Sequence, residues 1–241
     1  MQMTLGSINR PRGELAIRKL NATVPAPLGY TLRNRLRLSF LFGWLMVQIA
    51  HLFSKVSGLP VLVSNLQLKK RTWSHEAEGL EYLRLLKEEG RDAAEAFADR
   101  HAHWIDYGVV CYRLVTNNGV GAIVDAFQNT FELENFNYHG IGTGTNAENA
   151  SDSALQTEST TALNPDSTRA TGTQSEPASN QYRSVGVLTA DGAIAATEHG
   201  LFSQAATGGG VLLDRSVFSV INIASTETLQ TTYTLTVTAG G

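Results

Sequence analysis

The chain is poor in cysteine and in charged residues for its 241 residues. Its single cysteine, Cys111, excludes an intramolecular disulfide and a cysteine-rich zinc site. Because this residue stands in the apolar stretch Val109–Tyr112, we expect a buried and inert thiol. Charged residues make up only 17% of the chain, which indicates a protein that hides much of its surface in contacts.

A long hydrophobic run is also missing. A membrane-spanning helix needs about 20 apolar residues, whereas the apolar run Leu38–Phe53 is shorter and is interrupted by Ser39, Gly43, Gln48 and His51. The basic residues before this run resemble the start of a signal peptide, but they lie too far from residue 1 for that role. We therefore expect no membrane contact, and we expect this run to form a helix buried against a partner chain or a neighbouring copy.

Charge is distributed unevenly along the sequence. Residues 1–71 contain eleven Lys and Arg and one acidic residue, a net charge of +10. From Thr116 onward there are three Arg and twelve acidic residues, a net charge of −9. Opposite charges in two parts of a chain indicate different partners. The basic part is expected to bind something acidic, and the acidic part is expected to face water.

The basic part, residues 1–71, is predicted to be an extended N-terminal arm with an apolar anchoring segment and a short strand at residues 61–63. Its first thirty residues contain three prolines and no clear periodicity, so they have too little apolar surface to fold alone. A basic arm can bind protein or nucleic acid, but few aromatic residues and no nucleic-acid-binding motif accompany the charges, which favours protein. The predicted partner-binding residues are Arg10, Arg12, Arg18, Lys19, Arg33, Arg35, Arg37, Phe40, Phe42, Trp44, Lys69, Lys70 and Arg71.

Residues 72–131 form a second region, which we predict to be a linker of helical and mixed character. Ser74 is a suitable N-cap for a helix from His75 to about Glu89, and a second short helix begins at Asp92. Residues 104–115 are rich in β-branched and aromatic residues and predict a strand. Residues 120–128 predict an amphipathic helix, whose apolar side contains Ile123, Val124 and Phe127.

Residues 132–241 show no helical periodicity and are rich in Thr, Ser, Ala and Gly. Short β-prone runs recur between turn signals; Asp191-Gly192 predicts a hairpin and Gly208–Gly210 a loop. The pattern predicts a mainly β fold, with a C-terminal antiparallel β-sandwich of jelly-roll or immunoglobulin-like type. The predicted strands cover residues 136–141, 154–160, 168–174, 181–189, 193–203, 211–224 and 228–238.

Histidines and one glycine-rich segment are the main candidates for chemistry, and each has a simpler explanation. His101 and His103 could ligate a metal, but no third ligand follows at a fixed spacing. His139 and His199 each precede a glycine, and nothing in the sequence brings them together or supplies a nucleophile, so we expect hydrogen-bonded histidines where strands approach closely. The segment Gly140–Gly144 does not open the helix that a phosphate loop requires. No catalytic, cofactor-binding or metal-ligating residue is predicted.

Five phrases in the second half of the chain are distinctive: Val120–Asn129, Tyr138–Gly144, Ala154–Glu158, Arg169–Gln174 and Thr197–Ser203. Together with the sequence around them, from about residue 107 to residue 241, they resemble a family of structural proteins of tailed-bacteriophage particles. The resemblance implies a virion component with a β-sandwich domain. It carries no catalytic residue onto this chain.

These observations predict a structural protein of a phage particle and not an enzyme, with no cofactor and no small-molecule substrate. The preferred role is a capsid decoration (cement) protein on the capsid surface, whose arm binds the major capsid protein while the β-domain projects outward. Copies are expected to associate, and a trimer would suit the threefold positions of a capsid. The alternative is a tail, neck or fibre component with a receptor-binding sandwich. A polysaccharide-cleaving virion enzyme would need a carboxylate pair in a groove, whereas Glu132 and Glu134 lie on a loop-like stretch.

Overall fold

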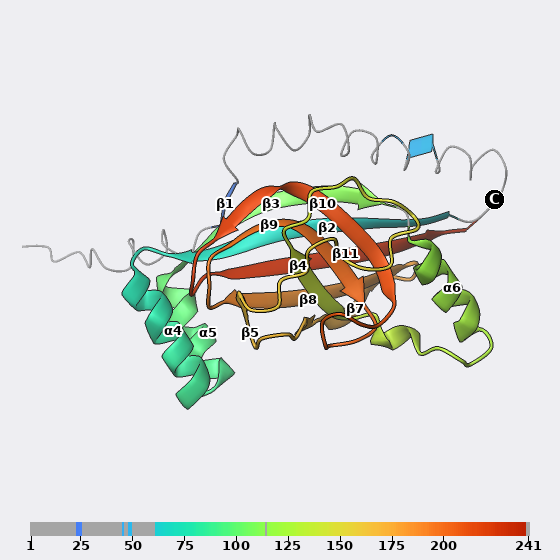
Figure 1. Ribbon diagram of the computed structural model, residues 1–241. Coiled ribbons are helices and arrows are strands. Elements are labelled where there is room, and N and C mark those ends of the chain that lie inside the picture. The colour runs from blue at the N-terminus through green and yellow to red at the C-terminus, as the bar shows by residue number, and fades with distance from the viewer. Residues whose placement is uncertain (1–22, 26–44, 46–47, 50–60, 114, 240–241) are drawn as a thin grey trace, which may run out of the picture.

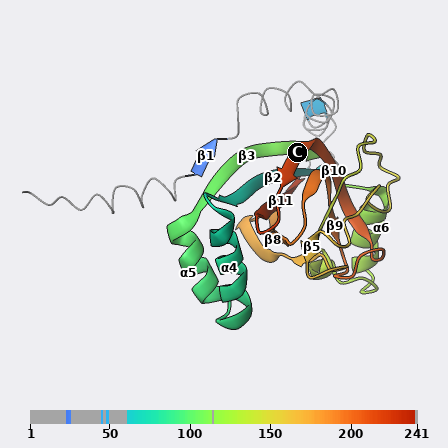
Figure 2. The same ribbon diagram turned by 60° about the vertical axis from the view of Figure 1, so that its left-hand side comes forward.

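The computed structural model describes residues 23–25, 45, 48–49, 61–113 and 115–239. In these residues the protein is mainly β, with two sheets packed against each other as a sandwich (Figure 1). A helical hairpin lies at one end of the sandwich and a single helix at the other, as the turned view also shows (Figure 2). The prediction of a mainly β fold with an antiparallel β-sandwich is therefore confirmed.

The larger sheet is built around β11, which pairs antiparallel with β2 on one side and with β8 on the other. The β2 pairing runs without a break from Val61 opposite Thr238 to Arg71 opposite Thr228. The order is β1-β3-β2-β11-β8-β5, with β7 also on β8, and β1 is parallel to β3. The strands are β1 (Thr23–Pro25), β2 (Val61–Trp73), β3 (Ala102–Arg113), β5 (Leu163–Asn164), β7 (Thr173–Ala178), β8 (Gln181–Ala190) and β11 (Thr228–Thr238).

The smaller sheet has the order β10-β9-β4-β6 and faces the larger one. Its strands are β4 (Tyr138–Gly142), β6 (Ala170–Thr171), β9 (Ile194–Phe202) and β10 (Leu212–Ile223). The core between the sheets includes Leu68 and Leu229 from the larger sheet and Ile141 and Phe218 from the smaller one, all at most 1% exposed. Burial of such apolar surface is the main force that holds the two layers together.

The strand boundaries differ from the sequence prediction where pairing is long-range. The strand expected at residues 61–63 is the thirteen-residue β2, and β1 lies within the region predicted to be an arm. The sandwich therefore takes in β2 and β3, although we placed its start at residue 132. Residues 154–160 form no strand, and Asp191-Gly192 joins β8 to β9 of the other sheet, so it does not close a hairpin. Partners distant in sequence decide these points, and local patterns do not contain them.

The helical hairpin consists of α4 (Glu76–Glu88) and α5 (Arg91–His101), close to the two helices predicted. The N-cap of α4 is His75, and not Ser74 as expected. The carboxylate of Glu78 reaches back to accept hydrogen bonds from the backbone amides of both residues, at 3.1 Å each. This contact satisfies amide groups that a helix start otherwise leaves unpaired.

The single helix α6 (Asn117–Ala126) begins three residues before the predicted one and is followed by the short 3-10 helix η1 (Leu133–Asn135). Thr116 caps α6: its hydroxyl accepts a hydrogen bond from the amide of Gly119 and donates one to the carbonyl of Leu212 in β10. The predicted apolar side is present, but much of it faces outward. Val124 is 53% exposed and Phe127 is 88% exposed.

Candidate functional site

Most of the predicted partner-binding residues lie outside the part of the chain that the structure describes. These are Arg10, Arg12, Arg18, Lys19, Arg33, Arg35, Arg37, Phe40, Phe42 and Trp44. The other three, Lys69, Lys70 and Arg71, are consecutive residues of β2 and belong to the larger sheet.

These three basic residues make contacts within their own chain. Lys69 lies 3.3 Å from Asp106 on β3, and Lys70 lies 2.9 Å from Glu227, next to the start of β11. The prediction had assigned them to an arm that binds another chain. Successive side chains of a strand point to opposite faces of the sheet, so Lys69 and Lys70 meet carboxylates of different neighbouring segments. The local sequence could not indicate these partners.

Arg71 is the clearest correction, because its side chain is only 2% exposed. Its guanidinium donates a hydrogen bond to Glu95 on α5 at 2.7 Å and another to Thr228 on β11 at 2.9 Å. It also lies 4.3 Å from the ring centre of Tyr82 on α4, a cation–π distance. Arg71 therefore attaches the helical hairpin to the sheet and is not available to a partner.

A buried histidine pair lies between the two sheets. His139 Nδ1 is 3.0 Å from His199 Nε2 and 2.8 Å from the hydroxyl of Thr231, and His139 Nε2 is 2.8 Å from the hydroxyl of Ser184. All four residues are at most 1% exposed. Burial lowers the pKa of His139 to about 3 and lowers that of His199 well below its usual value, so both rings are neutral near pH 7.

This cluster resembles a serine–histidine nucleophile pair only in its atom types. A substrate carbonyl would have to approach the Ser184 hydroxyl, which is 0% exposed. The glycines beside it leave no room either: a Cβ on Gly186 would lie 2.6 Å from the His139 ring, and one on Gly172 would lie 2.1 Å from the Ser184 hydroxyl. The cluster is a hydrogen-bonded part of the core, as expected for histidines at close strand contacts, although the sequence did not bring the two together.

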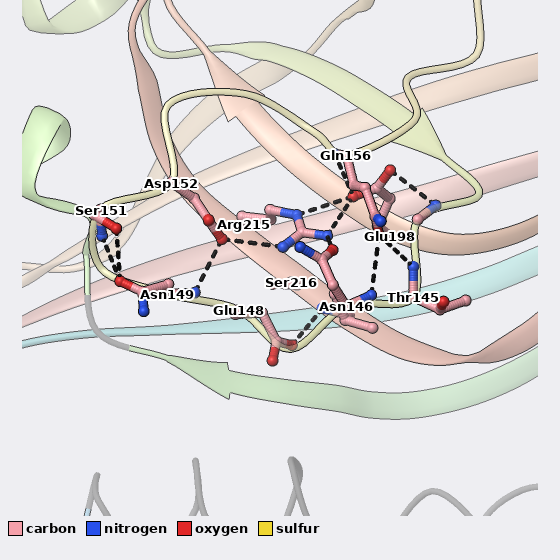
Figure 3. Close-up of polar contacts among 12 residues, drawn as sticks. Thr145, Asn146, Glu148, Asn149, Ser151, Asp152, Gln156, Glu198, Arg215 and Ser216 are labelled. Carbon is pink, nitrogen blue, oxygen red and sulfur yellow. Dashed lines mark hydrogen bonds and ion pairs between the residues drawn. The ribbon is translucent and has the colours of Figure 1, made fainter.

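A second buried polar cluster fastens the long loop after β4 to the smaller sheet (Figure 3). Glu198 on β9 accepts hydrogen bonds from the backbone amides of Gly144, Gln156 and Thr157 at 2.7–3.0 Å. Arg215 on β10 pairs with Glu198 and reaches out to Asp152 in the same loop at 3.0 Å. The glycine-rich segment thus serves close packing on Glu198: a Cβ on Gly144 would lie 2.5 Å from its carboxylate.

The other candidates for chemistry are separated from one another. The His101 ring stacks on Phe97, and its Nδ1 atom lies 3.6 Å from the Glu78 carboxylate. His103, by contrast, shares a hydrogen bond with the hydroxyl of Ser74. Among the described residues, no group of three or more His, Cys, Asp or Glu side chains is placed to hold a metal ion. No helix within the described ranges is long and apolar enough to cross a bilayer. Cys111 is buried, as expected.

An open apolar groove is the main surface feature that remains. It has a volume of about 920 Å³ and lies between α6, η1 and the adjoining ends of β2 and β11. We call it the α6 groove. Phe127, Leu133 and Val237 are 88%, 41% and 43% exposed there. Its apolar lining includes Leu62, Ile123, Phe127, Leu133, Leu235 and Val237.

The wall of the α6 groove is held in place by polar contacts. The amide of Gln174 on β7 donates hydrogen bonds to the carbonyl of Glu134 at 2.7 Å and to the Tyr182 hydroxyl at 3.0 Å. The Tyr182 hydroxyl donates in turn to the carbonyl of Phe136. Two exposed carboxylates, Glu134 and Glu176, lie among the lining residues. The sequence identified the apolar side of α6 but gave no sign that it would remain open.

No known protein-family model and no curated protein sequence matches this chain. The resemblance to phage virion proteins, stated on five sequence phrases, therefore stays a prediction.

Proposed function

We propose that the protein is a structural component of a tailed-phage particle, with capsid decoration as its role. The protein would bind neighbouring chains on the capsid surface and stabilise the shell by mass action. A protein that binds only the assembled shell shifts the equilibrium toward that state. The arm would contact the major capsid protein, and the sandwich would project outward.

The observation that carries this proposal is the α6 groove. Exposed apolar surface of this kind marks a site of contact with another molecule. It lies where the described sandwich begins, since Leu62 of β2 is part of its lining, and the residues before Val61 include both the arginine cluster and the apolar run. The two buried polar clusters, by contrast, have side chains closed to solvent and support packing, which agrees with a structural role.

Only part of the predicted arm supports the proposal. Residues 23–25 and 61–71 are strands of the chain's own larger sheet, so attachment must depend on the other residues of the basic region. The remaining candidates are the basic residues Arg10, Arg12, Arg18 and Lys19, the arginines at positions 33, 35 and 37, and the run Leu38–Phe53.

Quantifying this chain in purified particles by mass spectrometry, relative to the major capsid protein, tests the proposal. A fixed ratio of copies to capsid subunits over the whole shell is expected. A copy number that matches one ring or fibre at a single vertex would instead assign it to the tail, neck or fibre. Absence from purified particles would exclude a virion role.

A further inference from the structure

We infer that the α6 groove binds residues 33–53 of a second copy of this chain. The inference names the occupant of the groove and rests on the proposed function for the statement that copies lie side by side. It is argued from exposure, from charge and from the place where the described sandwich begins.

Two apolar surfaces are exposed on the same chain. One is the α6 groove, with Phe127 at 88% exposure. The other is on the helical residues Leu45 and Ile49, which are 49% and 47% exposed. These two apolar side chains are four residues apart, which is the spacing of neighbours on one face of a helix. If they lay in the groove of their own chain, Phe127 would be covered. Docking between copies covers both surfaces at once.

The charges beside the two surfaces are opposite. Three arginines, Arg33, Arg35 and Arg37, immediately precede the apolar run. The groove contains the exposed carboxylates of Glu134 and Glu176. Opposite charges at the edge of an apolar contact fix its direction and speed association. The basic end of the segment should therefore lie beside these two glutamates.

The start of β2 brings the segment close to the groove of an adjacent copy. Val61 pairs with Thr238, and the next residue, Leu62, lines the groove. Residues 54–60 can span at most about 25 Å when extended, which is enough for the segment of one copy to reach the groove of a copy that adjoins it at this end. Copies that meet at this end can each dock their segment in the groove of the next copy, so that the copies form a closed ring.

The groove also has the size and lining for such an occupant. Its volume of about 920 Å³ is that of a site which takes several side chains. Docking of an apolar helical face into an apolar groove is a common mode of recognition between chains.

Crosslinking between two differently tagged variants of the full-length chain tests the direction of docking. One variant carries Leu45→Cys and the other carries Phe127→Cys, and the two are expressed together and treated with a short bismaleimide. The native Cys111 is buried, so the introduced thiols are the accessible ones. We expect a covalent product that carries both tags. The matched control places the second cysteine at Leu80, which is 55% exposed. It belongs to α4, the helix at the end of the sandwich away from α6 (Figure 1).

Two results would overturn the inference. A yield of the doubly tagged product no higher than with Leu80→Cys would show that the segment does not dock in the groove. A crosslink confined to single chains of the Leu45→Cys/Phe127→Cys double variant would show that the segment docks on its own chain.

The mass of the purified protein in solution gives a second test. The unaltered chain should be a closed multimer, Phe127→Asp should be a monomer, and Leu80→Asp should keep the multimer. A monomeric unaltered chain, or a Phe127→Asp variant that remains multimeric, would overturn the inference. The copy number in particles is measured separately, so failure here is distinguishable from failure of the proposed function.

Discussion

Glu198 and Arg215 form an ion pair 2.8 Å long, in which the two side chains are 0% and 1% exposed. The carboxylate also accepts three backbone hydrogen bonds from the loop after β4, so each of its oxygens has several donors. Burial of two charges is costly unless each is fully paired. This saturation explains how the pair can lie in the interior and hold the loop on the sheet.

Removal of one partner of this pair should destabilise the fold strongly. Arg215→Met leaves the Glu198 carboxylate buried without its counter-charge, and such losses are about 3–5 kcal/mol. The matched control is Arg84→Met on α4, because Arg84 is 43% exposed and bonds three glutamates at the surface. Exposed pairs contribute about 0–1 kcal/mol. Urea unfolding measures both variants, and equal losses would contradict the assignment of Arg215 as a buried anchor.

Acidification should destabilise the protein through the buried histidine pair. An unfolded histidine takes up a proton as pH falls through about 6.5, whereas the folded pKa of His139 is about 3. The stability is therefore complete above pH 6.5 and decreases between pH 6.5 and pH 3, by up to about 1.4 kcal/mol per pH unit for each such histidine.

The share of His139 in this dependence can be isolated with His139→Gln, which does not titrate. The free energy of unfolding, measured in urea from pH 7.5 to pH 4.5, should depend less on pH in the variant than in the unaltered protein. Ring nitrogen resonances should also show neutral His139 and His199 at pH 5. Equal pH slopes, or a His139 ring that titrates near 6.5, would contradict the buried neutral pair.

Two glycines of α6 should respond oppositely to the same substitution. A Cβ on Gly119 would lie 2.7 Å from the backbone carbonyl of Leu213 and 2.6 Å from Val115, so Gly119→Ala should cost about 1–3 kcal/mol. A Cβ on Gly121 meets no atom within 4 Å, so Gly121→Ala should stabilise the helix by about 0.5–1 kcal/mol. Thermal unfolding compares the two. An unchanged stability of the Gly119→Ala variant would contradict the close packing of α6 against β10.

Neutralisation of the arginine cluster should weaken attachment to the particle. The triple variant Arg33→Gln, Arg35→Gln, Arg37→Gln removes charges that are each worth about 0–1 kcal/mol when exposed, but several arms multiply the effect by avidity. Bound copies should be counted as salt is raised, since exposed charges are screened over about 8–10 Å. The sandwich should unfold at the same temperature as before. Unchanged occupancy at every salt concentration would contradict an electrostatic contribution of these arginines to attachment.

Much of the fold follows from local sequence. The β-prone runs at residues 181–189, 193–203, 211–224 and 228–238 correspond to β8, β9, β10 and β11 within about one residue. β-prone residues bounded by turn residues are local signals, and these runs show them. The pairing of the strands does not follow from local sequence, because β11 lies between β8 and β2, and β2 is more than 150 residues away from β11 in the sequence. No local pattern specifies a partner at that distance.

Local sequence was enough to predict a mainly β chain, a buried cysteine, a helix near residue 120 with an apolar side, and a strong contrast of charge between the two parts of the chain. The contacts that these features make depend on how the chain folds in three dimensions. It brought His139 to His199, committed Arg71 to the helical hairpin, and left Phe127 exposed beside Val237. This difference arises because periodicity indicates which side of an element is apolar, whereas burial depends on which distant element covers that side.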